Sequence, residues 1–167
     1  MPENEPVAKL LVDTDHGNTI PWAKALRQLS EAQYYWLATV RPDNHPHLMP
    51  VLAVWLDNAM HFCANAGSRK AKNIASAPHC VLSAEHHKLH LVVEGKAEWV
   101  RDNEVLLRVA GGFAAKYGWE VSVRDGVFYA EGAPTAGPPP YQVYQVNPST
   151  IFGFGTDDTL NATRWRF

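Results

Sequence analysis

Apolar and polar positions alternate over most of the chain, which is the pattern of β-strands with one buried face. The clearest alternation covers residues 89–100, with the sequence LHLVVEGKAEWV. Other runs are rich in aromatic and β-branched residues and are bounded by turn residues. These further predicted strands cover residues 34–40, 47–55, 59–64, 80–85, 141–148 and 150–155, with a short hairpin at 120–129. The chain is therefore predicted to be mainly β.

Three segments have helical rather than strand periodicity. Residues 21–30 place apolar side chains at helical spacing, and residues 102–117 do the same before a terminating glycine. A two-turn helix is predicted between Ser68, as its N-cap, and Pro78, which ends it. Residues 131–140, rich in proline and glycine, are expected to form a loop. This order of elements predicts a small closed barrel with helices at its ends.

Length and charge limit the class of protein. The 167 residues have room for one domain, predicted over residues 19–167, after a flexible polar tail at 1–18. The net charge of −2 argues against binding to nucleic acid or a membrane surface. No apolar run reaches the roughly 18–20 residues of a membrane span. The first residues do not resemble a secretory signal, and Cys63 and Cys80 are expected to be buried, reduced thiols, so a cytoplasmic protein is favoured.

The segment with the clearest chemistry is GSRKAKN, at residues 67–73. The first N–H groups of a helix lack internal partners and carry the positive end of its dipole, so phosphate binds well there. Arg69, Lys70 and Lys72 lie in the same turn, where cations oppose the dipole. Arg69, Lys72 and Asn73 are predicted to share one helix face. The segment therefore predicts a phosphate site, with a solvated basic helix face as the alternative.

A resemblance to a known family rests on segments taken in order: HLMPVLAVW at 47–55, AMHFCANAGSRKAKNIASAP at 59–78, CVLSAE at 80–85 and LVVEGKAEWV at 91–100. Together they resemble the pyridoxamine 5′-phosphate oxidase-like, FMN-binding split-barrel superfamily. The closing GFGTDDTLNATRWRF, at 153–167, is similar to the branch that contains reductases dependent on the deazaflavin coenzyme F420. The resemblance implies a six- to seven-stranded antiparallel split β-barrel with helices. It also implies a homodimer with cofactor sites at the subunit interface.

The same resemblance implies which residues bind the cofactor. The basic turn would hold its phosphate, and the backbone of the second strand would lie against its flat ring system. From the C-terminus, Trp165 would stack on the ring and Arg166 would face its anionic edge, with packing of the terminal strand as the alternative for Trp165. Pro50 lacks an N–H, which independently predicts an interrupted strand there. The implied cofactor-binding residues are Met49, Pro50, Val51, Ala64, Asn65, Ser68, Arg69, Lys70, Lys72, Asn73, Trp165 and Arg166.

The resemblance leaves two functions open. One is an oxidoreductase that transfers hydride between the bound cofactor, FMN or coenzyme F420, and a small organic substrate. The other is a carrier that binds a flavin, a deazaflavin or haem without turnover. Oxidation of pyridoxamine phosphate itself is not expected, because the chain is short for that enzyme and lacks its substrate-phosphate arginine and histidine set. Histidines cluster around 45–47 and 86–90 without the fixed spacing of a metal motif, and no catalytic residue can be named.

Overall fold

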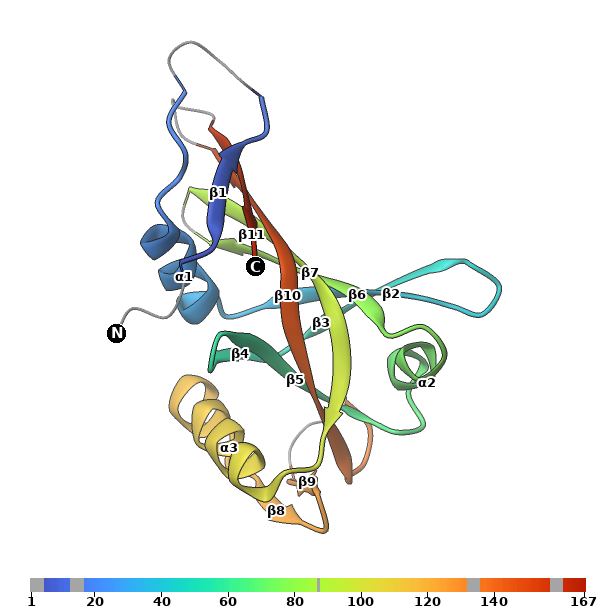
Figure 1. The fold of residues 1–167 in the computed structure, drawn as a ribbon. Helices are drawn as coiled ribbons and strands as arrows, with labels where there is room; N and C mark the ends of the chain where they lie inside the picture. Colours follow the sequence, from blue (N-terminus) through green and yellow to red (C-terminus); the bar gives the residue numbers. More distant parts are fainter. Residues whose placement is uncertain (1–4, 13–16, 87, 132–135, 157–160) are drawn as a thin grey trace.

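The computed structural model describes residues 5–12, 17–86, 88–131, 136–156 and 161–167. Strands are its main regular structure, as the sequence predicts, and their pairing is antiparallel throughout (Figure 1). The strands are β1 Val7–Leu10, β2 Tyr35–Val40, β3 Pro46–Val51, β4 Ala53–Leu56, β5 Ala59–Asn65, β6 His79–His86, β7 Leu89–Val100, β8 Ser122–Arg124, β9 Val127–Tyr129, β10 Tyr141–Gly155 and β11 Ala162–Arg166. The helices are α1 Trp22–Glu31, α2 Arg69–Ser76 and α3 Asn103–Tyr117.

Strand β10 connects two parts of the sheet. On one side it pairs with β7, and on the other it pairs first with β5 and then with β11. A register shift between Pro148 and Thr150 marks the change of partner. The two strands predicted at 141–148 and 150–155 are therefore one bent strand, because the bulge lets a single strand serve both parts.

Seven strands surround the larger core, in the order β4–β5–β10–β7–β6–β2–β3. Only Leu52 separates β3 from β4, yet the described residues contain no pairing between these two strands. The split-barrel prediction is confirmed, whereas the prediction of a closed ring is wrong. The predicted strand 47–55 breaks at Leu52 and not at Pro50, which pairs with Trp36 inside β3. Proline is tolerated there because β3 is an edge strand.

Side chains of α3 secure the break between β3 and β4. Lys116 Nζ donates hydrogen bonds to the Ala53 carbonyl, at 3.1 Å, and to the Tyr35 hydroxyl, at 2.8 Å. The Tyr117 hydroxyl accepts from Ala53 N at 3.2 Å and donates to Ala53 O at 2.8 Å. Burial lowers the pKa of Lys116 to about 8. These contacts pair backbone groups that a closed barrel would pair within a ladder.

The three predicted helices are present, and their ends follow the predicted capping. Helix α3 begins after Asp102, whose side chain accepts from Val105 N at 2.9 Å, and it ends at the left-handed Gly118. Helix α2 follows Ser68 and lies against the β2–β3 hairpin, whereas α3 lies beside β4 (Figure 1). Among the described residues, no helix combines the length and apolar character needed to cross a membrane. The hairpin predicted at 120–129 is formed by β8 and β9.

The N-terminal segment differs from the predicted flexible tail. Residues Val7–Leu10 form β1, which pairs with β11 in a register running from Val7 opposite Arg166 to Leu10 opposite Thr163. Strand β1 covers an edge of β11 that would otherwise remain unpaired. The rest of the predicted tail at 1–4 and 13–16 lies outside the described residues, as does the part of the predicted loop at 132–135.

Both cysteines are free thiols. Cys80 is buried and Cys63 is partly buried. Burial raises the pKa of each thiol to about 12. Since the thiolate is the reactive form, neither cysteine is poised for redox chemistry at neutral pH.

Trp165 is part of the larger core. Its side chain is 0% exposed and packs against Trp22, with 5.7 Å between the ring centroids. Gly153, opposite Thr163 in the adjacent strand, leaves the room that the indole occupies. A Cβ placed on Gly153 would lie 2.7 Å from two indole carbons, so this strand requires glycine for packing.

We expect Gly153→Ala to lower the free energy of unfolding by about 1–3 kcal/mol, because the added methyl group overpacks the core against Trp165. Gly111→Ala is the matched control, since a Cβ there meets nothing within 4 Å in the interior of α3. That substitution should instead stabilise by up to about 1 kcal/mol. Urea unfolding of both variants measures the difference, and equal effects would contradict the tight packing of Gly153 on the indole.

Candidate functional site: a basic turn beside an open strand edge

The turn before α2 is fixed by its own polar side chains. Asn65 Oδ1 accepts from Gly67 N at 2.7 Å, and the Ser68 hydroxyl caps the helix by accepting from Ala71 N at 3.3 Å. Asn65 Nδ2 also donates to the Pro138 carbonyl at 2.7 Å, which ties the turn to the segment before β10. Ala64, just before the turn, is buried in the core. Asn65 and Ser68 therefore hold the turn in shape, a role that the sequence did not separate from ligand binding.

Positive charge gathers at this turn. Arg69 is exposed and Lys70 is half-buried on the first turn of α2, and both lie near His47 of β3 together with Arg41 of the β2–β3 turn. Within the described part of the chain, none of the three cations has a carboxylate within 4 Å. Desolvation lowers the pKa of Lys70. A half-buried ammonium with no carboxylate within 4 Å among the described residues is the kind of group that a bound anion stabilises.

Two predicted members of the phosphate site do not face it as expected. Asn73 is fully buried, and its Nδ2 donates to Thr39 Oγ1 at 3.0 Å, so it points into the barrel instead of sharing the face of Arg69. Lys72 is exposed and lines a separate hollow of about 360 Å³ between α2 and the sheet, with Trp99 and Tyr144. The helical spacing was right, but α2 buries the Asn73 side of that face.

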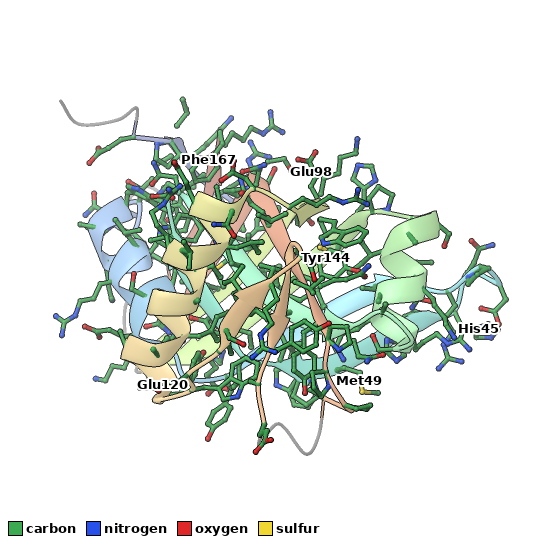
Figure 2. All side chains as sticks on the ribbon, turned by 90° about the horizontal axis from the view of Figure 1, so that it is seen from below. His45, Met49, Glu98, Glu120, Tyr144 and Phe167 are labelled. Atoms are coloured by element: carbon green, nitrogen blue, oxygen red, sulfur yellow. The ribbon has the colours of Figure 1, made fainter. Side chains whose placement is uncertain are left out.

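The free edge of β3 provides a second feature beside the cations. His47, Met49 and Val51 alternate onto the inner face of this strand, where Val51 and His47 are buried. Met49 is nonetheless exposed, because no strand of the described chain pairs with β3 on its far side. Figure 2 shows Met49 on the same hairpin as His45, which lies at its tip near α2. The split therefore leaves an accessible strand edge next to the basic turn.

The C-terminal pair divides between core and surface. Trp165 is enclosed in the core against Trp22, so the structure favours packing of the terminal strand over the predicted stacking on a cofactor ring. Strand alternation puts Arg166 at the surface, opposite Thr150 of β10 and Val7 of β1. Arg166 is therefore available to a ligand or a partner, whereas Trp165 is not.

The outer face of the sheet carries an apolar surface that the sequence did not reveal as one patch. Trp36, Val40 and Leu48 share this face through the β2–β3 register, and all three are exposed. Two hollows lie on it, one of about 570 Å³ beside Trp36 and His90 and one of about 380 Å³ beside Val40 and Val81. Exposed apolar side chains gathered on one face are typical of an interaction surface.

The described residues contain no group of three or more His, Cys, Asp or Glu side chains that could hold a metal ion. His45 pairs with Asp43 at 3.2 Å across the tip of the hairpin. His90 lies 3.9 Å from Glu85 on the outer face. The two groups of histidines that the sequence suggests therefore lie in different places, one on the β2–β3 hairpin and the other on β7 at the outer face.

Comparison with known proteins adds a family and a fold. The family model described as pyridoxamine 5′-phosphate oxidase matches residues 22–155. No curated protein matches the chain. A solved structure named as an F420 reductase is 22% identical, with a TM-score of 0.54, and the match covers 75% of this chain and 93% of that one.

Two further solved structures are similar in fold. A FAD-binding protein from Mesorhizobium loti has a TM-score of 0.60 at 11% identity, over 96% of this chain and 97% of that chain. A heme binding protein from Mycobacterium smegmatis has a TM-score of 0.64 at 14% identity, over 86% of this chain and 57% of that chain. At these identities the likeness supports the split-barrel fold alone.

We expect Lys70→Met to stabilise the ligand-free protein, because it removes a half-buried charge that lies beside other cations at a helix N-terminus. A charge that opposes the dipole costs about 0.3–1 kcal/mol, so a gain of that order is expected in urea unfolding at low salt. Lys72→Met, which removes an exposed charge from the same helix, is the control and should change stability less. Destabilisation by Lys70→Met would show that the ammonium already has a favourable partner.

Proposed function

Since the chain belongs to the pyridoxamine 5′-phosphate oxidase family, we propose that it is an oxidoreductase that binds FMN or coenzyme F420 and acts on a small organic substrate. The observation that carries the proposal is the cation cluster of Arg41, Arg69 and Lys70, which has no carboxylate within 4 Å among the described residues and adjoins the free edge of β3. When bound, such a cofactor supplies hydride transfer to or from its ring.

The residues present are suited to a flavin-type phosphate. Arg69 offers a planar fork of donors to two phosphate oxygens, and Lys70 offers a point charge from a half-buried position. The first N–H groups of α2 add donors at the positive end of the helix dipole. Because Ser68 and Asn65 already hold the turn in shape, little ordering is needed when an anion binds.

The strand edge is suited to the ring system. An unpaired edge presents alternating N–H and C=O groups, which complement the donors and acceptors on the pyrimidine end of a flavin or deazaflavin. Met49 lies two residues from His47, about 7 Å along the strand, so the edge and the anion cluster are adjacent. Met49 and Pro50 would cover one side of the ring and limit its contact with water.

The choice between the two cofactors depends on the groups attached beyond the phosphate. FMN ends in a phosphomonoester, whereas F420 continues through a phosphodiester into a lactyl-glutamyl tail with further negative charge. Lys72 lies on the same helix as Arg69, one turn further on, and lines the hollow between α2 and the sheet. Trp99 lines this hollow, and the guanidinium of Arg101 lies 3.9 Å from the centroid of its ring, so a second cation is nearby. The tail of F420 would extend in this direction.

The test is a titration of the purified protein with FMN and with F420, followed by fluorescence. Arg69→Ala should weaken either cofactor at least tenfold, because a charge-assisted contact contributes about 1.5–3 kcal/mol. Lys72→Ala should weaken F420 and leave FMN unchanged. Arg124→Ala, which removes an exposed arginine of β8, is the control. Equal affinity of the Arg69→Ala and unchanged proteins would overturn the phosphate placement.

The same preparation tests turnover. The bound cofactor is reduced, and its reoxidation by a panel of quinones and other unsaturated acceptors is compared with reoxidation by oxygen alone. Faster reoxidation by an organic acceptor supports an oxidoreductase. Reoxidation at the oxygen rate throughout supports the carrier alternative, and binding of neither cofactor directs the search to haem.

We further propose that two copies of the chain associate through the outer face that carries Trp36, Val40 and Leu48. Burial of these side chains from both copies removes apolar surface from water, which would stabilise the dimer by about 25 cal/mol for each Å² buried. The exposed strand edge leaves the site of one copy open, and a second copy would complete it, with its exposed Arg166 available to reach the partner's site. The proposed assembly is therefore a homodimer with its cofactor at the interface.

Leu48→Glu should convert the dimer to a monomer, because it places a charge in the apolar face. Leu107→Glu is the matched control: Leu107 is 55% exposed and Leu48 is 53% exposed, but Leu107 lies on α3. Sedimentation velocity measures the assembly state, and cofactor affinity should fall with the loss of the dimer. A dimer that survives Leu48→Glu and dissociates with Leu107→Glu would place the interface on α3.

A further inference from the structure

A chain of buried polar side chains runs from inside the barrel to the anion cluster. Asn73 Nδ2 donates to Thr39 Oγ1 at 3.0 Å, so the hydroxyl proton of Thr39 is free to be donated elsewhere. The next polar atom is His47 Nδ1, 3.4 Å from that oxygen. When Thr39 donates to it, Nδ1 is the acceptor and the proton of the neutral imidazole is on Nε2.

The other ring nitrogen of His47, Nε2, lies at the solvent end of this series of polar side chains. His47 is only 8% exposed, and no residue in the described chain forms a hydrogen bond with its Nε2. Even so, Nε2 is not a fully buried, unpartnered atom, so it must reach solvent. The small exposed part of the side chain therefore includes Nε2. The charged groups near the ring are Arg41 from the hairpin turn and Arg69 and Lys70 from α2.

We propose that His47 is a further ligand of the phosphate site, which donates Nε2–H to the anion and is held in that tautomer by Thr39 and Asn73. This inference rests on the proposed function, because it adds a residue to the same site. Three positive groups lie near the ring, and an Nε2–H at its exposed edge beside them is best satisfied by an acceptor that is itself negative.

The chain of contacts also accommodates a protonated His47. The Thr39 hydroxyl lies 3.5 Å from the His47 carbonyl, so it has a second acceptor to which its proton can turn. Its oxygen has two lone pairs and can then accept from both Asn73 Nδ2 and a protonated Nδ1. Rotation of one hydroxyl therefore serves both charge states without movement of the backbone.

This arrangement makes anion binding depend on pH in a stated direction. In the free protein, burial and then the charges of Arg41, Lys70 and Arg69 lower the pKa of His47. A bound dianion offsets those charges, so the pKa of His47 is higher in the complex. Between these two values the complex holds a proton that the free protein lacks. Affinity therefore increases as the pH falls through this window.

Sulfate is the appropriate probe, because it stays a dianion from pH 8 to pH 5.5, unlike a phosphomonoester with a second pKa of about 6. Nitrogen-detected NMR of the imidazoles gives the tautomer and pKa of His47 with and without sulfate. We expect Nε2–H at neutral pH and a higher pKa in sulfate. Each unit of increase in pKa corresponds to about a tenfold gain in sulfate affinity across the window.

His47→Gln should weaken sulfate about tenfold at pH 7.5, the lower end of what a charge-assisted contact contributes, and should abolish the gain at low pH. His45→Gln, at the exposed tip of the same hairpin, is the matched control and should alter neither. The NMR measurement on the unchanged protein stands even where His47→Gln fails to fold.

The outcomes separate this inference from the proposed function. A pKa of His47 that is the same with and without sulfate overturns the inference, while FMN or F420 binding would keep the proposed function intact. A raised pKa with no binding of either cofactor supports the anion site and removes the flavin assignment. Retention of the low-pH gain in His47→Gln assigns the proton to another group and also overturns the inference.

Discussion

The unpaired edge of β3 is the constraint on which the candidate site depends. A barrel of these seven strands could close only if β3 and β4 formed a ladder, and Leu52 is too short a connection to let two consecutive strands turn and pair. The break is instead held open by Lys116 and Tyr117, which bind both backbone groups of Ala53. As a result, the inner face of the strand reaches solvent at Met49.

The electrostatics of the site run against the stability of the free protein. The chain has a net charge of −2, yet three cations with no carboxylate within 4 Å in the described chain gather beside a helix N-terminus, where positive charge is already unfavourable. The polar chain behind them, from Asn73 through Thr39 to His47, is buried in surroundings that favour apolar side chains. A bound anion would neutralise the cations and would explain both features. The structure of the turn is therefore a stronger argument for an anion site than the short sequence motif.

Much of the fold could be predicted from the sequence, because strand alternation and helix caps are local properties. Ser68 and Asp102 were identified as caps and indeed accept the expected backbone hydrogen bonds. The pairing of β1 with β11 was not predictable, since it joins residues more than 150 positions apart and depends on an edge created by the rest of the sheet. The bend within β10 was not predicted either, because a proline such as Pro148 usually indicates the end of a strand.

The candidate site could be predicted where it depends on residue type. The prediction failed where the site depends on side-chain orientation. Arg69 and Lys70 stand where the motif placed them, but Trp165 and Asn73 turn inward because packing against Trp22 and Thr39 decides which face is buried. Arg41 and His47 join the cluster through the β2–β3 hairpin, a contact that spacing along the chain does not encode.

The open site and the apolar outer face also bear on each other energetically. In the proposed dimer, a cofactor that touches both subunits binds the dimer more tightly than the monomer. By mass action it must then strengthen association by the same factor. The polar cluster near α2 supplies the anchor within one subunit, whereas Trp36 and its neighbours supply the apolar surface that a second subunit would cover. Each chain would thus bind the charged part of one cofactor at its split edge and would cover the ring of its partner's cofactor with its outer face. Neither surface alone would keep a flat, anionic redox cofactor out of water.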